Sequence, residues 1–214
     1  MFDFISLDYS HFVAFLVATL VIAIIPGPDM AFIVSRSVSE GKKAGIATAC
    51  GMQVGVMFHI LLAACGLSAI LLKSALVFQI VKYIGAAYLI YLGIQTVRDK
   101  KGINITIQET QGGIRKAFWQ GAITDIFNPK VALFFLTFLP QFISPAMGNT
   151  FWQFTVLGVI FGCLTLVVDV CYSIIASSVR NVLVKNKTAM YWQKIVSGFT
   201  LIGLGTLLAL EKRS

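Results

Sequence analysis

The sequence predicts an all-α polytopic membrane protein, with six transmembrane helices arranged as two inverted three-helix repeats. Apolar residues make up 57% of the 214 residues and charged residues only 12%, roughly half the share in soluble domains. Apolar runs of about 20 residues recur along the chain, and each is long enough to cross the hydrocarbon core of a membrane. Two of these runs, the first of each repeat, are broken at prolines that lie 101 residues apart, Pro28 and Pro129.

The first span is interrupted inside the membrane. It is apolar over 12–25, breaks at Pro26-Gly27-Pro28, and resumes over about 30–35. The residues before the break cover about 21 Å of a core that is about 30 Å thick. Broken backbone at this depth must be surrounded by protein or by a water-filled cavity.

The remaining spans follow from the other apolar runs. A basic turn after the first span is expected to hold Arg36, Glu40, Lys42 and Lys43. Asn128 and Pro129 break the fourth span. We expect a single membrane domain over 1–214, with spans at about 44–72, 76–97, 117–143, 151–178 and 195–210, and the longest loop at about 98–116.

Lysine and arginine are distributed unevenly between alternate loops. The loops after the first, third and fifth spans hold 12 of the 17 basic residues. By the positive-inside rule these loops are cytoplasmic, so both termini are expected outside. An arrangement of five spans, in which the first run does not cross, is the alternative.

An internal repeat relates about 8–97 to about 117–210. Pro28 matches Pro129, and 82–93 matches 194–205 at an offset of 112. Because each half has three spans, an odd number, the halves must lie in the membrane with opposite orientations. This is the plan of many secondary transporters, in which broken helices at matching places mark the binding site.

The half-helices that begin at Pro28 and Pro129 are the candidate site. Proline suits the first position of a helix, and the free N–H groups there favour an anion such as an amino-acid carboxylate. The alternative is a pair of plain proline kinks.

Asp29 and Lys130 occupy matched positions beside the two breaks. An aspartate suits the first turn of a helix, so a purely structural role is the alternative for Asp29. Lys130 opposes the dipole of its own helix and costs at least about 2.5 kcal/mol in mid-membrane unless it is paired or hydrated. We expect it to face a cavity, a substrate carboxylate, or Asp125, with a structural Asp125–Lys130 pair as the alternative.

Three further ionisable residues are candidates for proton coupling: Asp169, Asp125 and His59. Buried ionisable groups in membrane spans are functional candidates by default. For His59, a hydrogen-bonded contact between helices is the alternative. His59 and Asp169 lie on stripes of small or polar residues that we expect to face the bundle. These stripes are Gly45, Met52, Gly55, His59, Ala63, Gly66 and Gly158, Gly162, Thr165, Asp169, Ser173, Ala176.

Composition argues against several other classes of protein. The net charge of +8 comes from residues scattered among loops, so no nucleic-acid partner is expected. The four cysteines lie inside apolar runs with no C-x-x-C pair, so neither a disulfide framework nor a metal site is expected. We also expect no cofactor.

The ordered motifs resemble the LysE/RhtB family of amino-acid exporters, and the resemblance covers nearly the whole chain. The motifs are Pro26-Gly27-Pro28-Asp29, Glu40-Gly41-Lys42-Lys43-Ala44-Gly45, Gly51-x-x-x-Gly55, Gly85-Ala86-Ala87-Tyr88-Leu89-Ile90-Tyr91-Leu92-Gly93, Asn128-Pro129-Lys130-Val131-Ala132-Leu133-Phe134-Phe135 and Phe138-Leu139-Pro140-Gln141-Phe142.

The resemblance implies a transporter and not an enzyme. It implies export of amino acids or close metabolites across the bacterial inner membrane by proton antiport. Its expected partners are the substrate, protons and the lipid bilayer, and a homodimer is left open. On that analogy the central site is formed by Pro26, Gly27, Pro28, Asn128, Pro129 and Lys130.

The alternative function is a membrane thiol–disulfide electron carrier of the DsbD/CcdA type. Such a carrier needs a reactive cysteine near the broken first helix of each half. Here Cys50 and Cys65 lie in the second span, and Cys163 and Cys171 lie in the fifth. The placement of the cysteines therefore disfavours this alternative.

Overall fold

The computed structural model describes residues 9–25, 27–67, 75–98 and 113–178, and single residues between 195 and 210. The described part is helical and contains no strand. Its elements are α1 (Tyr9–Ile24), α2 (Pro28–Glu40), α3 (Lys42–Leu62), the π-helix η2 (Ala63–Leu67), α5 (Ala75–Arg98), α6 (Gly113–Ile126), α7 (Pro129–Leu133), the π-helix η3 (Phe134–Phe138), the 3₁₀ helices η4 (Leu139–Phe142) and η5 (Pro145–Met147), and α8 (Thr150–Ser178).

Both predicted breaks are confirmed. α1 ends at Ile24 and α2 begins at Pro28, while α6 ends at Ile126 and α7 begins at Pro129. The chain bends by 51° at the first break and by 44° at the second. Each proline starts its half-helix, where its missing N–H removes no intrahelical hydrogen bond.

By length and composition, two described helices could each cross a membrane. They are α3 with η2, over Lys42–Gly66, and α8, over Thr150–Ser178. If each bent pair counts as one span, the described part holds up to four. The predicted sixth span, at about 195–210, lies largely outside the described residues.

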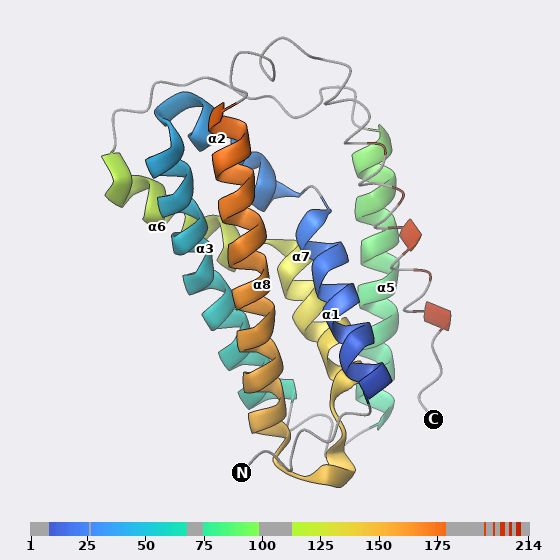
Figure 1. Cartoon of the computed structure of the whole chain (residues 1–214). Helices are drawn as coiled ribbons and strands as arrows, with labels where there is room; N and C mark the ends of the chain where they lie inside the picture. The colour runs from blue at the N-terminus through green and yellow to red at the C-terminus, as the bar shows by residue number, and fades with distance from the viewer. Residues whose placement is uncertain are drawn as a thin grey trace.

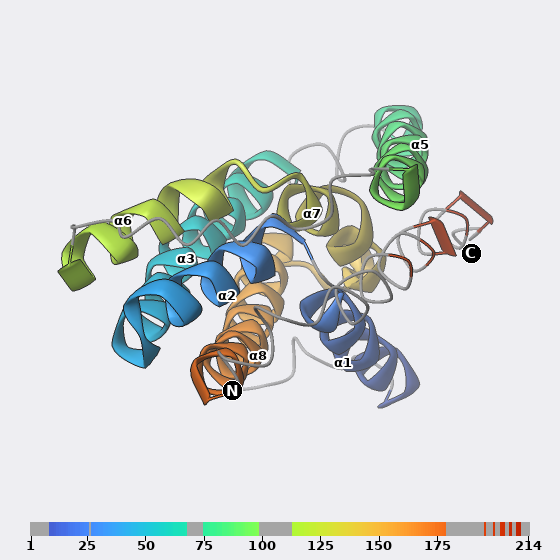
Figure 2. The ribbon, with the colours of Figure 1, turned by 90° about the horizontal axis from the view of Figure 1, so that it is seen from above.

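The helices form one bundle in which α3 packs against α2, α6 and α8. α1 continued by α2 runs along the bundle, as α8 does (Figure 1). Seen from above, α7 lies near the centre, with α3 and α5 beside it (Figure 2). Asp29 and Lys130, in the first turns of α2 and α7, are buried inside this bundle.

Glycines let α3 and α6 approach at backbone distance. A Cβ on Gly51 would overlap the Phe118 carbonyl oxygen, and a Cβ on Gly121 would overlap that of Thr48. Gly55 is the next residue on this face of α3, where a Cβ would lie 2.6 Å from Asp125 Cβ. The Gly51-x-x-x-Gly55 pattern is therefore a packing face inside the chain.

An aromatic core lies between α1, η3 and α8. The rings of Phe134 and Phe161 stack with centroids 4.4 Å apart, and Phe135 meets Phe161 edge-on at 5.2 Å. Phe15 of α1 adds a third ring layer beside Phe134. Through these aromatic contacts, α1 in the first half of the chain packs against η3 in the second half, which packs against α8.

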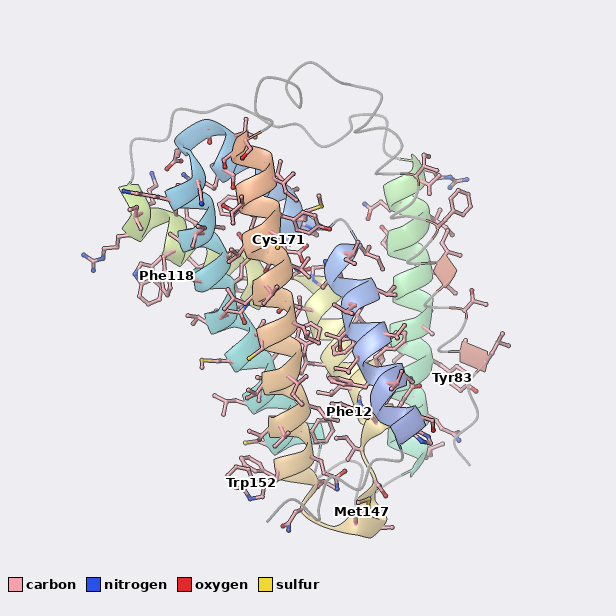
Figure 3. All side chains as sticks on the ribbon, viewed as in Figure 1. Phe12, Tyr83, Phe118, Met147, Trp152 and Cys171 are labelled. Atoms are coloured by element: carbon pink, nitrogen blue, oxygen red, sulfur yellow. The ribbon has the colours of Figure 1, made fainter. Side chains whose placement is uncertain are left out.

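Large apolar side chains also cover the outside of the bundle, as a lipid environment requires. Met57, Leu61 and Val167 are more than half exposed. Trp152 and Tyr83 point away from the bundle (Figure 3). The interior of the described part, by contrast, contains charged side chains.

The predicted basic turn is wrong in one respect. Arg36 and Glu40 lie within α2, and Arg36 is only 5% exposed. Its guanidinium bonds to Glu40 one turn on and to Gln120 of α6, and it lies 5.2 Å from the Phe32 ring centroid. These partners compensate for burying its charge, so the helix continues to Glu40 and the turn is reduced to Gly41.

The boundaries of the longest loop also differ from the prediction. α6 begins at Gly113, so Arg115 and Lys116 are exposed residues of its first turn and not of the loop. Gly113 has φ of +64°, a value that glycine adopts without strain.

The two small-residue stripes face inward, with one exception. Every residue named in the α8 stripe is buried, as are those of the α3 stripe up to Ala63. Gly66 is exposed, because the π-helix η2 places about one extra residue in its turn and rotates the stripe outward.

Candidate functional site

The site lies where the two breaks meet. Gly27 precedes α2 in an extended conformation, and Asn128 precedes α7. Asn128 Oδ1 accepts a hydrogen bond of 3.0 Å from the Lys130 backbone N–H, which satisfies one free donor of the α7 N-terminus. The α2 N-terminus has no side-chain cap of this kind.

Asp29 and Lys130 form an ion pair across the breaks. Lys130 Nζ lies 2.6 Å from Asp29 Oδ2, and the two residues are 4% and 8% exposed, respectively. The pair joins the matched positions of the two halves, and no signal in the sequence predicted that partner. The Asp125–Lys130 pair, kept as an alternative, is not the ion pair that forms.

Lys130 also caps the broken end of α1. Its Nζ donates a hydrogen bond of 3.0 Å to the Ile25 carbonyl oxygen, and the Tyr172 hydroxyl donates one of 2.9 Å to that of Ile24. These carbonyls belong to the C-terminal end of a helix, where a cation is favourable. Lys130 therefore opposes the dipole of its own helix but complements that of α1.

Gly27 leaves the space in which the pair forms. A Cβ at this position would lie 2.6 Å from Asp29 Oδ1 and 3.3 Å from Lys130 Nζ. Pro28 itself is exposed and Pro129 is half-buried. Pro26 lies outside the described residues.

A small cavity adjoins the ion pair. Its volume of about 10 Å³ is enough for roughly one water molecule. Four ionisable side chains line it, from α2, α6, α7 and α8, together with two neutral polar residues and an apolar wall. The charged lining is Asp29, Asp125, Lys130 and Asp169, the polar lining is Gln53 and Thr165, and the wall includes Met52, Val56 and Phe161.

Two polar atoms around the cavity are buried without a hydrogen-bond partner. They are Asp29 Oδ1 and Gln53 Nε2, whereas the side chains of Asp125 and Asn128 lie close enough to interact with each other. Unsatisfied buried polar groups are costly and rare in folded proteins, so two of them at one cavity need an explanation. A polar ligand that fills the cavity would supply one.

His59 is near this site but does not line the cavity. Its Nε2 lies 3.2 Å from the Asp125 carbonyl oxygen, and its ring stacks on Phe135 with centroids 5.9 Å apart. These contacts are those of a hydrogen-bonded helix contact, the alternative kept for this residue. His59 therefore stays a candidate for proton coupling only by way of its contact with Asp125.

Sequence reasoning did not single out Gln53 or Tyr172. Gln53 had a detectable signal, because it is a polar residue in the middle of an apolar span. Tyr172 had none, since only the fold places its hydroxyl against Ile24.

The cysteines lie away from the cavity. Cys50, Cys65, Cys163 and Cys171 are exposed and carry free thiols. They are on α3, η2 and α8, and Cys171 is labelled on α8 in Figure 3. None of them is at either break, which agrees with their placement in the sequence.

The family model described as LysE type translocator matches residues 20–212. The chain is 30% identical to an uncharacterized membrane protein of Vibrio cholerae over 207 residues, which are 96% of this chain and 100% of the relative. It is 31% identical to the homoserine/homoserine lactone efflux protein of Salmonella typhimurium, covering 81% of this chain and 84% of the relative. No solved structure matches the chain.

Proposed function

Because the chain belongs to the LysE type translocator family, whose members are transporters and not enzymes, we propose that it exports amino acids or close metabolites from the cytoplasm. The transport is secondary-active, by proton antiport with alternating access. The efflux protein of Salmonella typhimurium supports the direction of transport and the chemical class of the substrate.

The observation that carries this proposal is the Asp29–Lys130 ion pair on the wall of the cavity. Each charge placed in a membrane interior costs at least about 2.5 kcal/mol unless it is paired or hydrated. A purely structural link between α2 and α7 could be made by apolar packing at less cost. An ion pair, however, suits a charged substrate, because a charged group of the substrate can replace one partner of the pair.

The substrate binds at the two breaks. Its ammonium group lies near Asp29 or Asp169, and its carboxylate, where it has one, lies near Lys130 and Asn128. Gly27, Pro28 and Pro129 shape the backbone there, with Pro26 at the same break. The cavity holds roughly one water molecule, so the helices around it separate to admit an amino acid.

Alternating access follows from two inverted repeats. The bent pair α1–α2 corresponds to α6–α7, and α3 corresponds to α8. The third helix of the first repeat is α5, and its counterpart is the sixth span. Rocking of one half against the other would expose the breaks first to the cytoplasm and then to the outside.

Proton coupling uses the carboxyl groups of the cavity. Asp125, Asp169 and Asp29 line it together with Lys130. A carboxyl oxygen that carries a proton cannot at the same time bind the ammonium of the substrate. A proton from outside that binds Asp169 would therefore displace the substrate ammonium, and Asp125 is the alternative coupling residue, with His59 acting through Asp125.

The expected location is the bacterial inner membrane, with both termini outside. The ends of α2, α5 and α8 and the start of α6 lie toward one end of the bundle (Figure 1). Exposed Lys42 and Lys43 begin α3 directly after the end of α2, and exposed Arg115 and Lys116 lie at the start of α6. The positive-inside rule makes that end cytoplasmic. A homodimer stays a prediction.

Efflux from proteoliposomes tests the proposal directly. Liposomes holding the purified protein are loaded with labelled L-homoserine, L-threonine, L-leucine or L-lysine, and efflux is followed with and without an imposed proton gradient. We expect efflux of at least one amino acid, faster with the gradient and absent from protein-free liposomes. If folded protein releases none of them, export of amino acids is wrong.

Asp169→Asn is expected to remove the response to the proton gradient. The amide keeps the size of the side chain but exchanges no proton, so efflux should run at the same rate with and without the gradient. Thr155→Val on the same helix is the matched control, because the Thr155 hydroxyl is exposed and bonds within α8. If Asp169→Asn still follows the gradient while Asp125→Asn does not, Asp125 is the coupling residue.

A further inference from the structure

Each proline that begins a second half-helix removes a hydrogen-bond donor from the helix before it. In an α-helix, the N–H of one residue bonds to the carbonyl oxygen four residues earlier. Pro28 and Pro129 have no N–H, so the carbonyls of Ile24 and Asp125 lose the donors that a continuous helix would supply. Because the prolines lie 101 residues apart, these two carbonyls occupy matched positions in the two halves of the chain.

A side chain from the other half of the chain bonds to each of these carbonyls. The Tyr172 hydroxyl of α8 donates a hydrogen bond of 2.9 Å to the Ile24 carbonyl oxygen. His59 of α3 places its Nε2 3.2 Å from the Asp125 carbonyl oxygen. A carbonyl oxygen only accepts, so His59 Nε2 must carry the hydrogen of this bond. The two side chains thereby replace the donors that the prolines removed.

Neither donor lines the cavity, but the segments that they hold do. Ala23 in the last turn of α1 and the Asp125 side chain in the last turn of α6 are part of the lining. The carbonyl next to that of Ile24 belongs to Ile25 and accepts the hydrogen bond from Lys130 Nζ. The positions of these two helix ends therefore decide where the charged groups of the cavity lie.

The rings of both donors also pack against their neighbours. The Tyr172 ring lies beside the cluster of Ile33, Ala49 and Met52, and the His59 ring stacks on Phe135. A phenylalanine in either place would keep an aromatic ring but supply no donor. Packing and hydrogen bonding can therefore be separated at both positions by substitution.

We infer that Tyr172 and His59 are positioning residues for transport, and that their hydrogen bonds fix the ends of α1 and α6 in the geometry that binds the substrate. His59 acts in this way only as a donor and carries no proton through the transport cycle. Its Nε2 hydrogen stays in the bond to the Asp125 carbonyl, while the carboxyl groups of the cavity exchange protons. This inference rests on the proposed function.

The dependence of efflux on substrate concentration tests the inference. Proteoliposomes are loaded with increasing amounts of whichever of L-homoserine, L-threonine, L-leucine and L-lysine the unmodified protein exports fastest. Tyr172→Phe and His59→Phe should each raise the half-saturating concentration about 3- to 10-fold, as expected for the loss of one hydrogen bond, and leave the maximal rate within about 2-fold. Ser178→Ala removes an exposed hydroxyl that bonds within α8, and it is the matched control that should change neither value.

His59→Gln separates hydrogen bonding from proton transfer. The side-chain amide of glutamine places an N–H about as far from the backbone as histidine Nε2, but it does not titrate. We expect this variant to keep the half-saturating concentration within about 2-fold of that of the unmodified protein. Its efflux should also be accelerated by the proton gradient as much as that of the unmodified protein.

The possible outcomes separate the inference from the proposed function. Thermal unfolding in detergent identifies the variants that are folded, and if His59→Phe is not, Tyr172→Phe and His59→Gln decide. An unchanged half-saturating concentration in a folded phenylalanine variant would overturn the role of that residue. Loss of the response to the gradient in folded His59→Gln would show that His59 carries a proton. No efflux of any amino acid by the unmodified protein would instead overturn the proposed export, and the inference with it.

Discussion

Lys130→Met is expected to abolish export and to destabilise the folded protein. The substitution leaves Asp29 as a buried carboxylate without its partner and frees the Ile25 carbonyl at the end of α1. Removing one member of a buried ion pair costs about 3–5 kcal/mol. If the same contacts hold the site in its binding geometry, transport should fall by on the order of 100-fold. Proteoliposome efflux and thermal unfolding in detergent measure the two effects.

The double variant Asp29→Asn/Lys130→Met separates the structural role from the functional one. Removing both charges leaves neither member of the ion pair buried without its partner, so the thermal stability should recover most of the loss caused by Lys130→Met. Export should stay lost, because neither charge of the ion pair remains to exchange with the substrate. If Lys130→Met, or the double variant, transports at the original rate, the ion pair is not the substrate site.

Gly51→Ala is expected to destabilise the protein severely, although Gly51 does not itself line the cavity. The added methyl group would overlap the Phe118 carbonyl oxygen of α6. Because the obstacle is backbone, relief requires α3 and α6 to move apart. Overpacking of this kind costs about 3 kcal/mol. The melting temperature of the detergent-solubilised protein should fall by roughly 6–12 °C.

Gly66→Ala is the matched control for this prediction. It lies on the π-helix that continues α3, and an added Cβ there meets nothing within 4 Å. Its melting temperature should therefore be unchanged or slightly higher. Gly51→Ala and Gly121→Ala together should cost less than the sum of the two, since both separate the same helices. An unchanged melting temperature for Gly51→Ala would show that this contact is looser than the structure has it.

The sequence by itself determined where the helices break and which faces turn inward. Proline cannot continue a helix without losing a hydrogen bond, so Pro28 and Pro129 had to begin new half-helices. Small residues at helical spacing had to face other helices, because they allow the backbones to approach. Both properties depend on local chemistry, and the structure confirms both, apart from Gly66.

Only the tertiary structure decided which charges meet. Asp29 and Lys130 are 101 residues apart, and Asp125 was the partner in the chain that local spacing offered for Lys130, as an alternative to a cavity or a substrate carboxylate. Arg36 and Glu40 resembled a loop in the sequence, because charges near the end of a span usually face water. Gln120 and Phe32 supply the buried environment that keeps them in α2.

The cavity could likewise not be predicted in detail from the sequence. Its wall combines residues from α1, α2, α3, α6, α7 and α8, whose relative rotation depends on close contacts such as Gly51 against Phe118. A π turn or a bend of 44° at one break shifts which side chains converge there. The sequence thus determined the parts of the site, and the packing of the helices decided which of its polar atoms stay free for a substrate.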